Sequence, residues 1–348
     1  MRLLPDFAAA TPALRAGLLP ALLALAALAA GSGSSSPHSS DWFAPAERAR
    51  IDRIDTAQAT TPSPRQWHLE RLHAPQAWRQ AAGEGVVIAI LDSGVDAQHP
   101  DLAGQLLPGR NFMDGGTDTR DATGHGTAVA AAAAAAFNRQ ERLAGMATRA
   151  RILPLKVSDE RGYASARAVH DAIIHAADSG VRVVNVSFED VITNPLVMRA
   201  AAYLRAKGGV LVVPTGNGGQ LTRPQAAAGM ITVAATDLQD QHPEWSSGGA
   251  GLAVAAPGVD LLLARRGGGY ARCSGTSYAS PLVAGVLALM LAAKPEAGIA
   301  ELVRVMQATA VDLGEPGPDA LFGHGRVDAA AAVAALTRGS GAASPDRL

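Results

Sequence analysis

The chain has 348 residues, of which 48% are hydrophobic and 18% charged, so it is long enough for one large domain with a sizeable buried core. Thirty lysines and arginines stand against 31 aspartates and glutamates, and no basic run occurs, which argues against a nucleic-acid partner. The single cysteine, Cys273, excludes an intrachain disulfide framework.

The N-terminus has the features of an export signal. Arg2 and Arg15 precede an apolar run over residues 17–30, and Ala27-Leu28-Ala29 fits an A-x-A cleavage pattern. This run is short for a membrane span, which needs about 20 residues. We therefore predict a signal peptide over residues 1–30, with an uncleaved anchor as the alternative, and no stable membrane domain beyond it. The protein is then exported, to a periplasm or out of the cell.

Composition divides the rest of the chain into three parts. Residues 31–65 are polar and rich in serine and proline, which predicts a linker or short pro-segment. A folded domain is expected over residues 66–337. Residues 338–348 have the composition of a disordered tail.

Within the domain, short apolar runs alternate with helical stretches, a pattern typical of βαβ units and a parallel sheet covered on both faces. The most apolar helix is expected over residues 277–294; it is hydrophobic nearly all round and should be buried. The predicted fold is α/β, with three layers and a doubly wound, mostly parallel sheet. The expected strands are 86–91, 151–157, 181–186, 210–213 and 231–235, and the other expected helices follow Gly126 and cover 164–179 and 195–207.

Polar residues follow several of these strands, where open α/β sheets bind ligands. Asp92 directly follows the first strand, although a loop aspartate that caps a turn would look the same. Asn217 lies in a Gly-rich segment after the strand 210–213, from which its side chain could donate a hydrogen bond; an ordinary Asn-Gly turn is the alternative.

Two further segments combine a reactive side chain with a helix start. His125 lies between two glycines, which allow other backbone to approach its imidazole, but a lone histidine is more often structural. Ser277 begins the most apolar helix, where backbone N–H groups and the helix dipole suit a nucleophile whose attack creates an oxyanion. A helix-capping serine is the alternative, and Ser274, Thr276 and Ser280 are competing hydroxyls.

Taken as a set, these segments resemble the three signature motifs of the subtilisin-like serine proteases (subtilases). The motifs are Asp92-Ser93-Gly94, Gly124-His125-Gly126-Thr127 and Ser274-Gly275-Thr276-Ser277, in the chain order Asp, His, Ser. Further similar segments lie in order between Trp67 and Val333, among them His99-Pro100-Asp101-Leu102, Asn185-Val186-Ser187, Thr215-Gly216-Asn217 and Gly323-His324-Gly325-Arg326-Val327.

The resemblance implies a serine endopeptidase that acts on polypeptides through an acyl-enzyme. In this mechanism Ser277 is the nucleophile, His125 the general base and then acid, and Asp92 the group that orients the imidazole. Asn217 and the backbone N–H of Ser277 would form the oxyanion hole. A monomer is expected.

The resemblance also implies which residues contact the substrate: Ser187, Phe188, Glu189 and Gly216. Where the family carries a small-residue pair, this chain has Phe188-Glu189-Asp190. The two carboxylates could favour basic substrate residues by charge complementarity, or could narrow the pocket or face solvent.

No cofactor is predicted. Some subtilases bind calcium near the position of Asp101, but Arg139 and Arg142 are unfavourable neighbours for such a site, and no metal-ligating motif is present. A catalytically impaired pseudo-protease that binds peptides is the alternative function. An esterase or lipase is disfavoured, because Ser277 does not lie in a G-x-S-x-G motif.

Overall fold

The computed structural model describes residues 3–4, 66–138, 143–188, 191–222 and 228–338. Apart from Leu3, Leu4 and Arg338, the predicted signal peptide, linker and tail lie outside the described residues.

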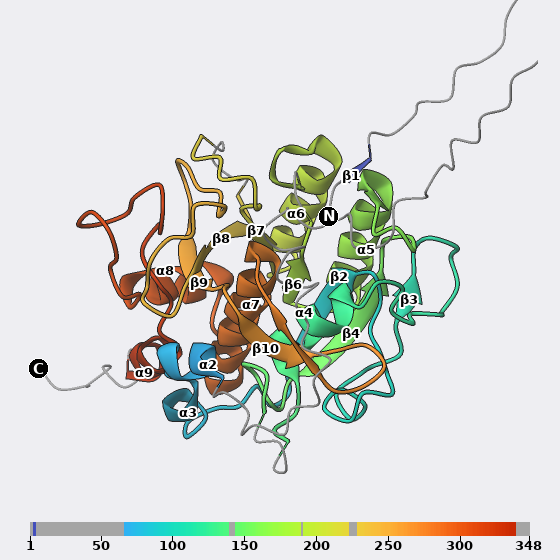
Figure 1. The fold of residues 1–348 in the computed structure, drawn as a ribbon, viewed down its shortest axis with the longest axis horizontal. Helices are drawn as coiled ribbons and strands as arrows, with labels where there is room; N and C mark the ends of the chain where they lie inside the picture. Colours follow the sequence, from blue (N-terminus) through green and yellow to red (C-terminus); the bar gives the residue numbers. More distant parts are fainter. Residues whose placement is uncertain (1–2, 5–65, 139–142, 189–190, 223–227, 339–348) are drawn as a thin grey trace, which may run out of the picture.

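The centre of the fold is a seven-stranded sheet in the order β3-β4-β2-β6-β7-β8-β9, in which every neighbouring pair is parallel (Figure 1). A second, two-stranded antiparallel sheet is the hairpin β10–β11, and the short strands β1 and β5 pair in parallel. The strands are β1 (Leu3–Leu4), β2 (Val87–Asp92), β3 (Arg110–Asn111), β4 (Arg151–Lys156), β5 (Ala164–Ser165), β6 (Val183–Val186), β7 (Val210–Pro214), β8 (Met230–Thr236), β9 (Val254–Pro257), β10 (Leu261–Ala264) and β11 (Tyr270–Cys273).

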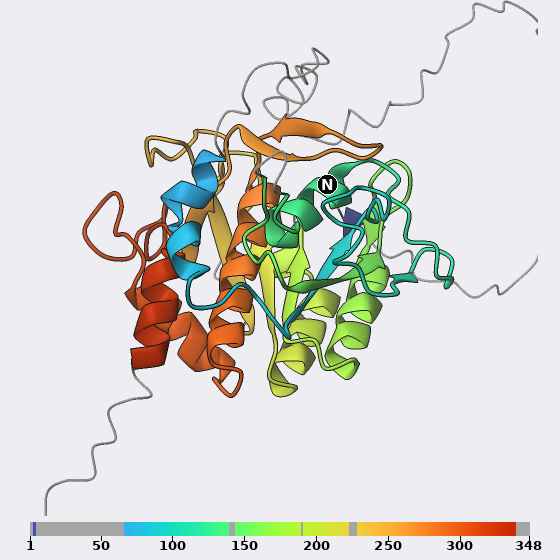
Figure 2. The same cartoon turned by 90° about the horizontal axis from the view of Figure 1, so that it is seen from below.

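Helices cover both faces of the large sheet. Helices α5 and α6 pack together on one face, and α4 and α7 pack together on the other (Figures 1 and 2). The short helices α2 and α3 and the C-terminal helices α8 and α9 extend the second layer. The helices are α2 (Trp67–Arg71), α3 (Ala74–Ala77), α4 (His125–Ala134), α5 (Ala166–Asp178), α6 (Pro195–Ala206), α7 (Thr276–Ala293), α8 (Ile299–Ala308), α9 (Ala329–Arg338) and the 3₁₀ turn η2 (Val191–Thr193).

The two layers follow from the two-residue period of a strand. In β2, Ile88 and Ile90 lie in the core cluster with α4 and α7, whereas Ala89 and Leu91 lie in the cluster with α5 and α6. Side chains of successive residues point to opposite faces, so a strand buried on both faces must be apolar throughout. The predicted three-layer α/β fold is confirmed.

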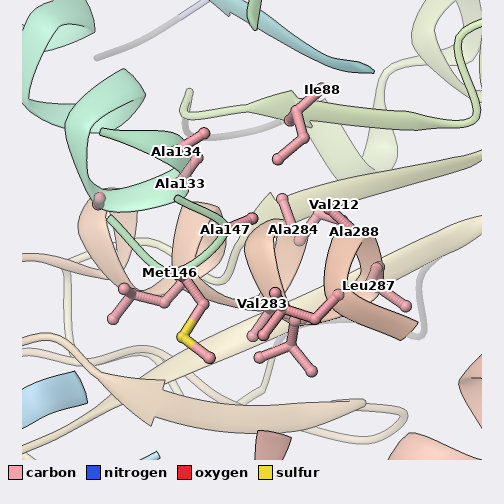
Figure 3. Packing of buried hydrophobic residues seen from close by; sticks show 14 of the residues in the cluster. Ile88, Ala133, Ala134, Met146, Ala147, Val212, Val283, Ala284, Leu287 and Ala288 are labelled. Atoms are coloured by element: carbon pink, nitrogen blue, oxygen red, sulfur yellow. The ribbon is translucent and has the colours of Figure 1, made fainter. Parts of the chain in front are cut away.

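Small side chains bring α4 and α7 close together. Every residue of α4 is buried, and Figure 3 shows Ala133 and Ala134 on α4 lying near Ala284 on α7 and Ile88 on β2. Helix α7 is the one helix in the described part of the chain that is long and apolar enough to cross a membrane, and 89% of it is buried inside the protein. It is therefore a core helix.

Candidate active site

Three predicted site residues lie at or just after the ends of three adjacent strands. Asp92 ends β2, Ser187 follows β6, and Asn217 lies three residues after β7. Since β2, β6 and β7 are parallel neighbours, their carboxyl ends meet at one edge of the sheet. This is the edge at which open α/β sheets bind ligands.

The helices on one face contribute the other two predicted catalytic residues. His125 is the first residue of α4, and Ser277 is the second residue of α7. Because α4 and α7 pack against each other, their N-termini bring these side chains to the same edge as Asp92.

His125 and Asp92 form a buried, hydrogen-bonded pair. The Nδ1 atom of His125 lies 2.8 Å from Asp92 Oδ1 and 3.0 Å from Oδ2, and the two residues are only 4% and 1% exposed. The backbone N–H of Ser93 donates a further hydrogen bond of 2.7 Å to Oδ1. A carboxylate in this position fixes the tautomer and direction of the imidazole, which leaves Nε2 to act on a proton.

Two glycines permit this close approach. A Cβ atom on Gly126 would lie 2.1 Å from the carbonyl oxygen of Gly94 and 3.0 Å from the Asp92 Cβ. Gly94 has a φ of 111°, and a Cβ there would lie 2.5 Å from the carbonyl oxygens of Thr119 and Arg120. The glycines of the two motifs are therefore needed because the strand end and the histidine loop touch through their backbones.

Asp121 organises the loop that carries His125, and sequence reasoning did not identify it. Its Oδ1 accepts hydrogen bonds from the Ser93 hydroxyl (2.7 Å) and from the backbone N–H groups of Thr123 (3.0 Å) and Gly124 (2.9 Å). Its Oδ2 accepts from the backbone N–H of Thr127 (2.9 Å) and from the Thr127 hydroxyl. The only sequence signal is a carboxylate four residues before a histidine in a Gly-rich loop, which has no characteristic periodicity.

The two neighbours of Ser277 in the chain contact Asn217 and His125. Thr276, which precedes it, donates from its backbone N–H and its hydroxyl to Asn217 Oδ1, each over 2.9 Å. Tyr278, which follows it, packs on His125 with ring centroids 5.4 Å apart. The carbonyl of Ser277 itself accepts a 3.0 Å hydrogen bond from the Ser187 hydroxyl.

The competing hydroxyls have structural partners. Thr276 Oγ1 is bonded to Asn217, Ser274 Oγ accepts from the backbone N–H of Asp260 (2.8 Å), and Ser280 is fully buried within α7. Each of the three competing hydroxyls is thus hydrogen-bonded or enclosed by the structure around it.

The four predicted substrate-binding residues differ in their surroundings. Ser187 is buried and bonded to Ser277, and the backbone N–H of Gly216 donates to Thr276 Oγ1 over 3.2 Å. Phe188 is fully buried in the core cluster that contains α5 and α6, so its side chain faces the core. Glu189 and its neighbour Asp190 lie outside the described residues.

Among the residues that the structure describes, those around Asp101 do not fit a calcium ion. Its Oδ1 accepts a 2.7 Å hydrogen bond from Asn138 Nδ2, and its Oδ2 accepts one of 2.7 Å from the Tyr270 hydroxyl. The nearby Gln66 Oε1 is likewise engaged, by the backbone N–H of Ala144 over 2.8 Å. Calcium requires several oxygen ligands, whereas these oxygens accept hydrogen bonds from neutral protein donors. The described parts of the chain contain no group of three or more His, Cys, Asp or Glu side chains that could hold a metal ion.

A cavity of about 220 Å³ opens beside the imidazole of His125. One wall is the start of α4 with its preceding loop, another is the hairpin β10–β11, and Tyr278 of α7 completes it. Figure 2 shows this hairpin, in orange, lying across one edge of the molecule.

This edge of the sheet carries a buried histidine–carboxylate pair and a serine at the start of a helix. These are the groups that hydrolysis by a serine nucleophile requires. The fold and site thus define an α/β serine hydrolase. Comparison with known proteins identifies the family. The model of the subtilase family matches residues 83–325.

Individual relatives agree with this assignment. Thermitase of Thermoactinomyces vulgaris is 39% identical over 230 residues, which cover 66% of this chain and 82% of thermitase. The thermophilic serine proteinase of Bacillus sp. (strain AK1) is 38% identical over 271 residues, which cover 77% of this chain and 67% of that protein. Among solved structures, a protease of Pseudoalteromonas arctica has a TM-score of 0.69 at 30% identity and covers 80% of this chain and 99% of its own. MycP1 from the ESX-1 type VII secretion system has a TM-score of 0.70 at 25% identity and covers 80% of this chain and 89% of its own.

The chain therefore belongs to the subtilase family and is a serine-type endopeptidase. The predicted family membership is confirmed.

Proposed function

We propose that the protein cleaves peptide bonds through an acyl-enzyme, with Asp92, His125 and Ser277 as the catalytic triad. The observation that carries this proposal is the buried His125–Asp92 pair at the start of α4, which packs against α7, the helix that carries Ser277. The Ser277 hydroxyl attacks the scissile carbonyl while His125 Nε2 takes its proton. The same proton then passes to the leaving amine as the C–N bond breaks. Water next attacks the acyl-enzyme with the same help from His125, and the Ser277 oxygen leaves as the acid product is released.

Asn217 is the side-chain donor of the proposed oxyanion hole. Because its Oδ1 accepts two hydrogen bonds from Thr276, the orientation of the amide group is fixed and Nδ2 is the atom that can donate toward the oxyanion. The backbone N–H of Ser277, at the positive end of α7, supplies the second donor.

Labelling with a fluorophosphonate tests the nucleophile. The wild type should be labelled and should cleave a peptide library, whereas Ser277→Ala should lose both while keeping its fold. Ser280→Ala removes a hydroxyl one helical turn away and should still be labelled. Labelling that persists in Ser277→Ala would overturn the proposal.

The variant Asn217→Asp tests the oxyanion hole. It keeps an oxygen for Thr276 but replaces the Nδ2 donor with a negatively charged oxygen. We expect kcat to fall about 10²- to 10³-fold with a small change in KM, the size of loss known for such a donor in subtilisin, a member of the same family. A kcat within a few-fold of wild type would contradict this role.

We also infer that the protein is exported and that catalysis needs no metal ion. The apolar run over residues 17–30 supports export. The hydrogen bonds that occupy both Asp101 oxygens support the second inference. N-terminal sequencing of the protein recovered outside the cytoplasm tests the first, and peptidase activity that survives EDTA tests the second.

A further inference from the structure

The cavity beside His125 lies on the leaving-group side of the proposed reaction. His125 must protonate the departing amine, so the amine half of the substrate leaves across the imidazole. The cavity is lined by His125 and Tyr278 but not by Asn217, Ser187 or Gly216, the residues expected on the acyl side. The residues that follow the cleaved bond are therefore the ones that reach it.

The floor of this cavity is apolar and its rim is basic. Small or apolar side chains form the floor: Ala128, Ala264, Ala271, Cys273 and Tyr278. Arg265 and Arg266, at the start of the turn that joins β10 to β11, also line the cavity, and both residues are exposed. A substrate side chain in this cavity thus meets two guanidinium groups.

The turn is held in place by contacts to the two loops that carry Asp92 and His125. Arg266 donates to the carbonyl oxygens of Asp121 and Ala122, each over 3.0 Å. The backbone N–H of Gly267 donates to Asp96 Oδ2 over 2.8 Å. The basic rim is therefore a fixed part of the active-site wall.

The positive charge of this rim is only partly balanced. Among the residues that the structure describes, the charge of Arg266 acts on the carboxylate of Asp96, and the carboxylate of Asp121 accepts hydrogen bonds from its own loop. Arg265 makes no side-chain hydrogen bond or ion pair with any residue that the structure describes. Its guanidinium is available to a ligand carboxylate, with which it can pair in a bidentate way.

We propose that Arg265, aided by Arg266, selects substrates with an acidic residue just after the cleaved bond. This inference rests on the proposed function, because it assigns the specificity of the leaving-group half of the same site. An exposed Arg–carboxylate pair is a modest interaction, so each pairing should change kcat/KM by about two- to fivefold.

A peptide series tests the proposal. All peptides share one acyl half, and the two residues after the cut are glutamate, its neutral counterpart glutamine, or lysine. We expect kcat/KM in the wild type to be highest for the glutamate peptide, lower for the glutamine peptide and lowest for the lysine peptide. The ratio of kcat/KM for the glutamate peptide to that for the lysine peptide should approach one in 1 M NaCl, because salt screens exposed charges. Arg265→Glu should reverse the order of glutamate and lysine.

Arg272→Ala is the matched control, since Arg272 lies on the same hairpin but pairs with Asp260 over 2.8 Å and does not line the cavity. It should retain the wild-type ratio. Equal cleavage of the glutamate and glutamine peptides by the wild type, or an unchanged ratio in Arg265→Glu, would overturn the inference. If cleavage does not depend on the charge of the substrate but is lost in Ser277→Ala, the proposed function is still supported. Peptide cleavage that survives Ser277→Ala would refute the proposed function itself.

The reverse step gives a second readout that does not depend on peptide cleavage. An ester with the same acyl half forms the acyl-enzyme. The α-carboxamide of glutamate (glutamate amide) or of glutamine (glutamine amide) is then added as an acceptor that competes with water. The acceptor nitrogen attacks the acyl carbonyl, its proton passes to His125, and the Ser277 oxygen leaves with a proton returned by the imidazole. Glutamate amide should capture about two- to fivefold more acyl group than glutamine amide. Equal capture would contradict the inference.

Discussion

The Ser93 hydroxyl donates a 2.7 Å hydrogen bond to Asp121 Oδ1, and this contact joins the two loops that carry Asp92 and His125. Ser93 Oγ also accepts hydrogen bonds from the backbone N–H of Gly126 (3.1 Å) and from the Thr123 hydroxyl (2.9 Å). A buried carboxylate thus fixes the loop that carries His125 through hydrogen bonds to Ser93 and to the loop backbone. Asp121 is 6% exposed, so each of these bonds is made away from solvent.

Replacing Asp121 by asparagine should reduce the rate of catalysis more than substrate binding. The asparagine side chain would keep one acceptor oxygen, but its NH₂ group would face the backbone N–H of Thr127, which is also a donor. We expect kcat to fall about 10- to 100-fold through misplacement of His125, with KM within about twofold of wild type. Steady-state kinetics of Asp121→Asn measures this split.

Asp118→Asn is the matched control for Asp121→Asn. Asp118 lies in the same loop, but it is exposed and pairs with the exposed Arg120. Its replacement should leave kcat unchanged. Equal effects of the two substitutions, or a loss that appears only in KM, would remove Asp121 from a positioning role.

The Ser187 hydroxyl should stabilise both the fold and the conformation of the nucleophile. It donates to the Ser277 carbonyl (3.0 Å) and accepts from Asn185 Nδ2 (2.9 Å). Ser187→Ala leaves both partners buried without it, which should cost about 1–3 kcal/mol of unfolding free energy. Urea unfolding should be measured in a Ser277→Ala background to prevent self-digestion, and kcat in the active enzyme.

Ser165→Ala gives the comparison for Ser187→Ala. The Ser165 hydroxyl caps helix α5 by accepting from the backbone N–H of Ala168 over 3.0 Å. Its loss should also lower stability, by about 1 kcal/mol, but kcat should not change. If Ser187→Ala likewise leaves kcat unaltered, its contact with Ser277 has no catalytic consequence.

Strongly apolar strands and long helices were predictable from the sequence, because burial on both faces leaves a continuous apolar signal. Residues 210–213 were predicted as a strand and lie in β7 (Val210–Pro214), and the helix expected over 277–294 is α7 (Thr276–Ala293). The hairpin β10–β11 was missed. Its strands are four residues each, and the turn between them is held by side chains distant in sequence, such as His99, whose Nε2 lies 2.9 Å from the Gly269 carbonyl oxygen.

In the site, too, only the residues with a local sequence signal could be predicted. Asp92, His125 and Ser277 stand in short motifs with neighbouring glycines, so the sequence alone indicates them. Arg265 and the Asp121 carboxylate have no such motif. Their roles depend on which loops the fold brings together, and that information is spread over segments more than 100 residues apart.

His68 should make the protein less stable in acid. It is fully buried, neither ring nitrogen has a hydrogen-bond partner among the described residues, and burial, aided by the charge of Arg272, lowers its pKa to about 3 from the ordinary 6.5. Above pH 6.5 the imidazole is neutral in both the folded and the unfolded state. Below that pH the unfolded chain binds a proton that the folded protein excludes, so stability falls by about 1.4 kcal/mol per pH unit between 6.5 and about 3.

The variant His68→Phe tests this linkage. Its unfolding free energy, measured by urea between pH 7 and pH 4.5 in the Ser277→Ala background, should decline less than that of the parent by roughly 2–3 kcal/mol. His175→Phe is the comparison. Burial, aided by the charge of Arg110, also lowers the pKa of His175, but this side chain is only half-buried. His175→Phe should therefore change the dependence of the unfolding free energy on pH less than His68→Phe does. Parallel stability curves for His68→Phe and its parent would show that His68 does not control the acid sensitivity.

Gly285 should control how closely the helices that carry His125 and Ser277 can pack. A Cβ atom at this position of α7 would lie 2.4 Å from the Met146 Cβ and 2.9 Å from the carbonyl oxygen of Ala133 on α4. Alanine would gain about 1 kcal/mol in helix propensity, but these contacts involve rigid atoms, and overpacking a dense core costs about 1–3 kcal/mol or more. We therefore expect Gly285→Ala to lower the unfolding free energy and, because α4 and α7 are pushed apart, to lower kcat as well.

Gly104→Ala, at a position with no atom within 4 Å of the added methyl group, should change neither quantity. A Gly285→Ala enzyme as stable and active as wild type would show that the separation of the two helices does not set the geometry between their N-terminal residues.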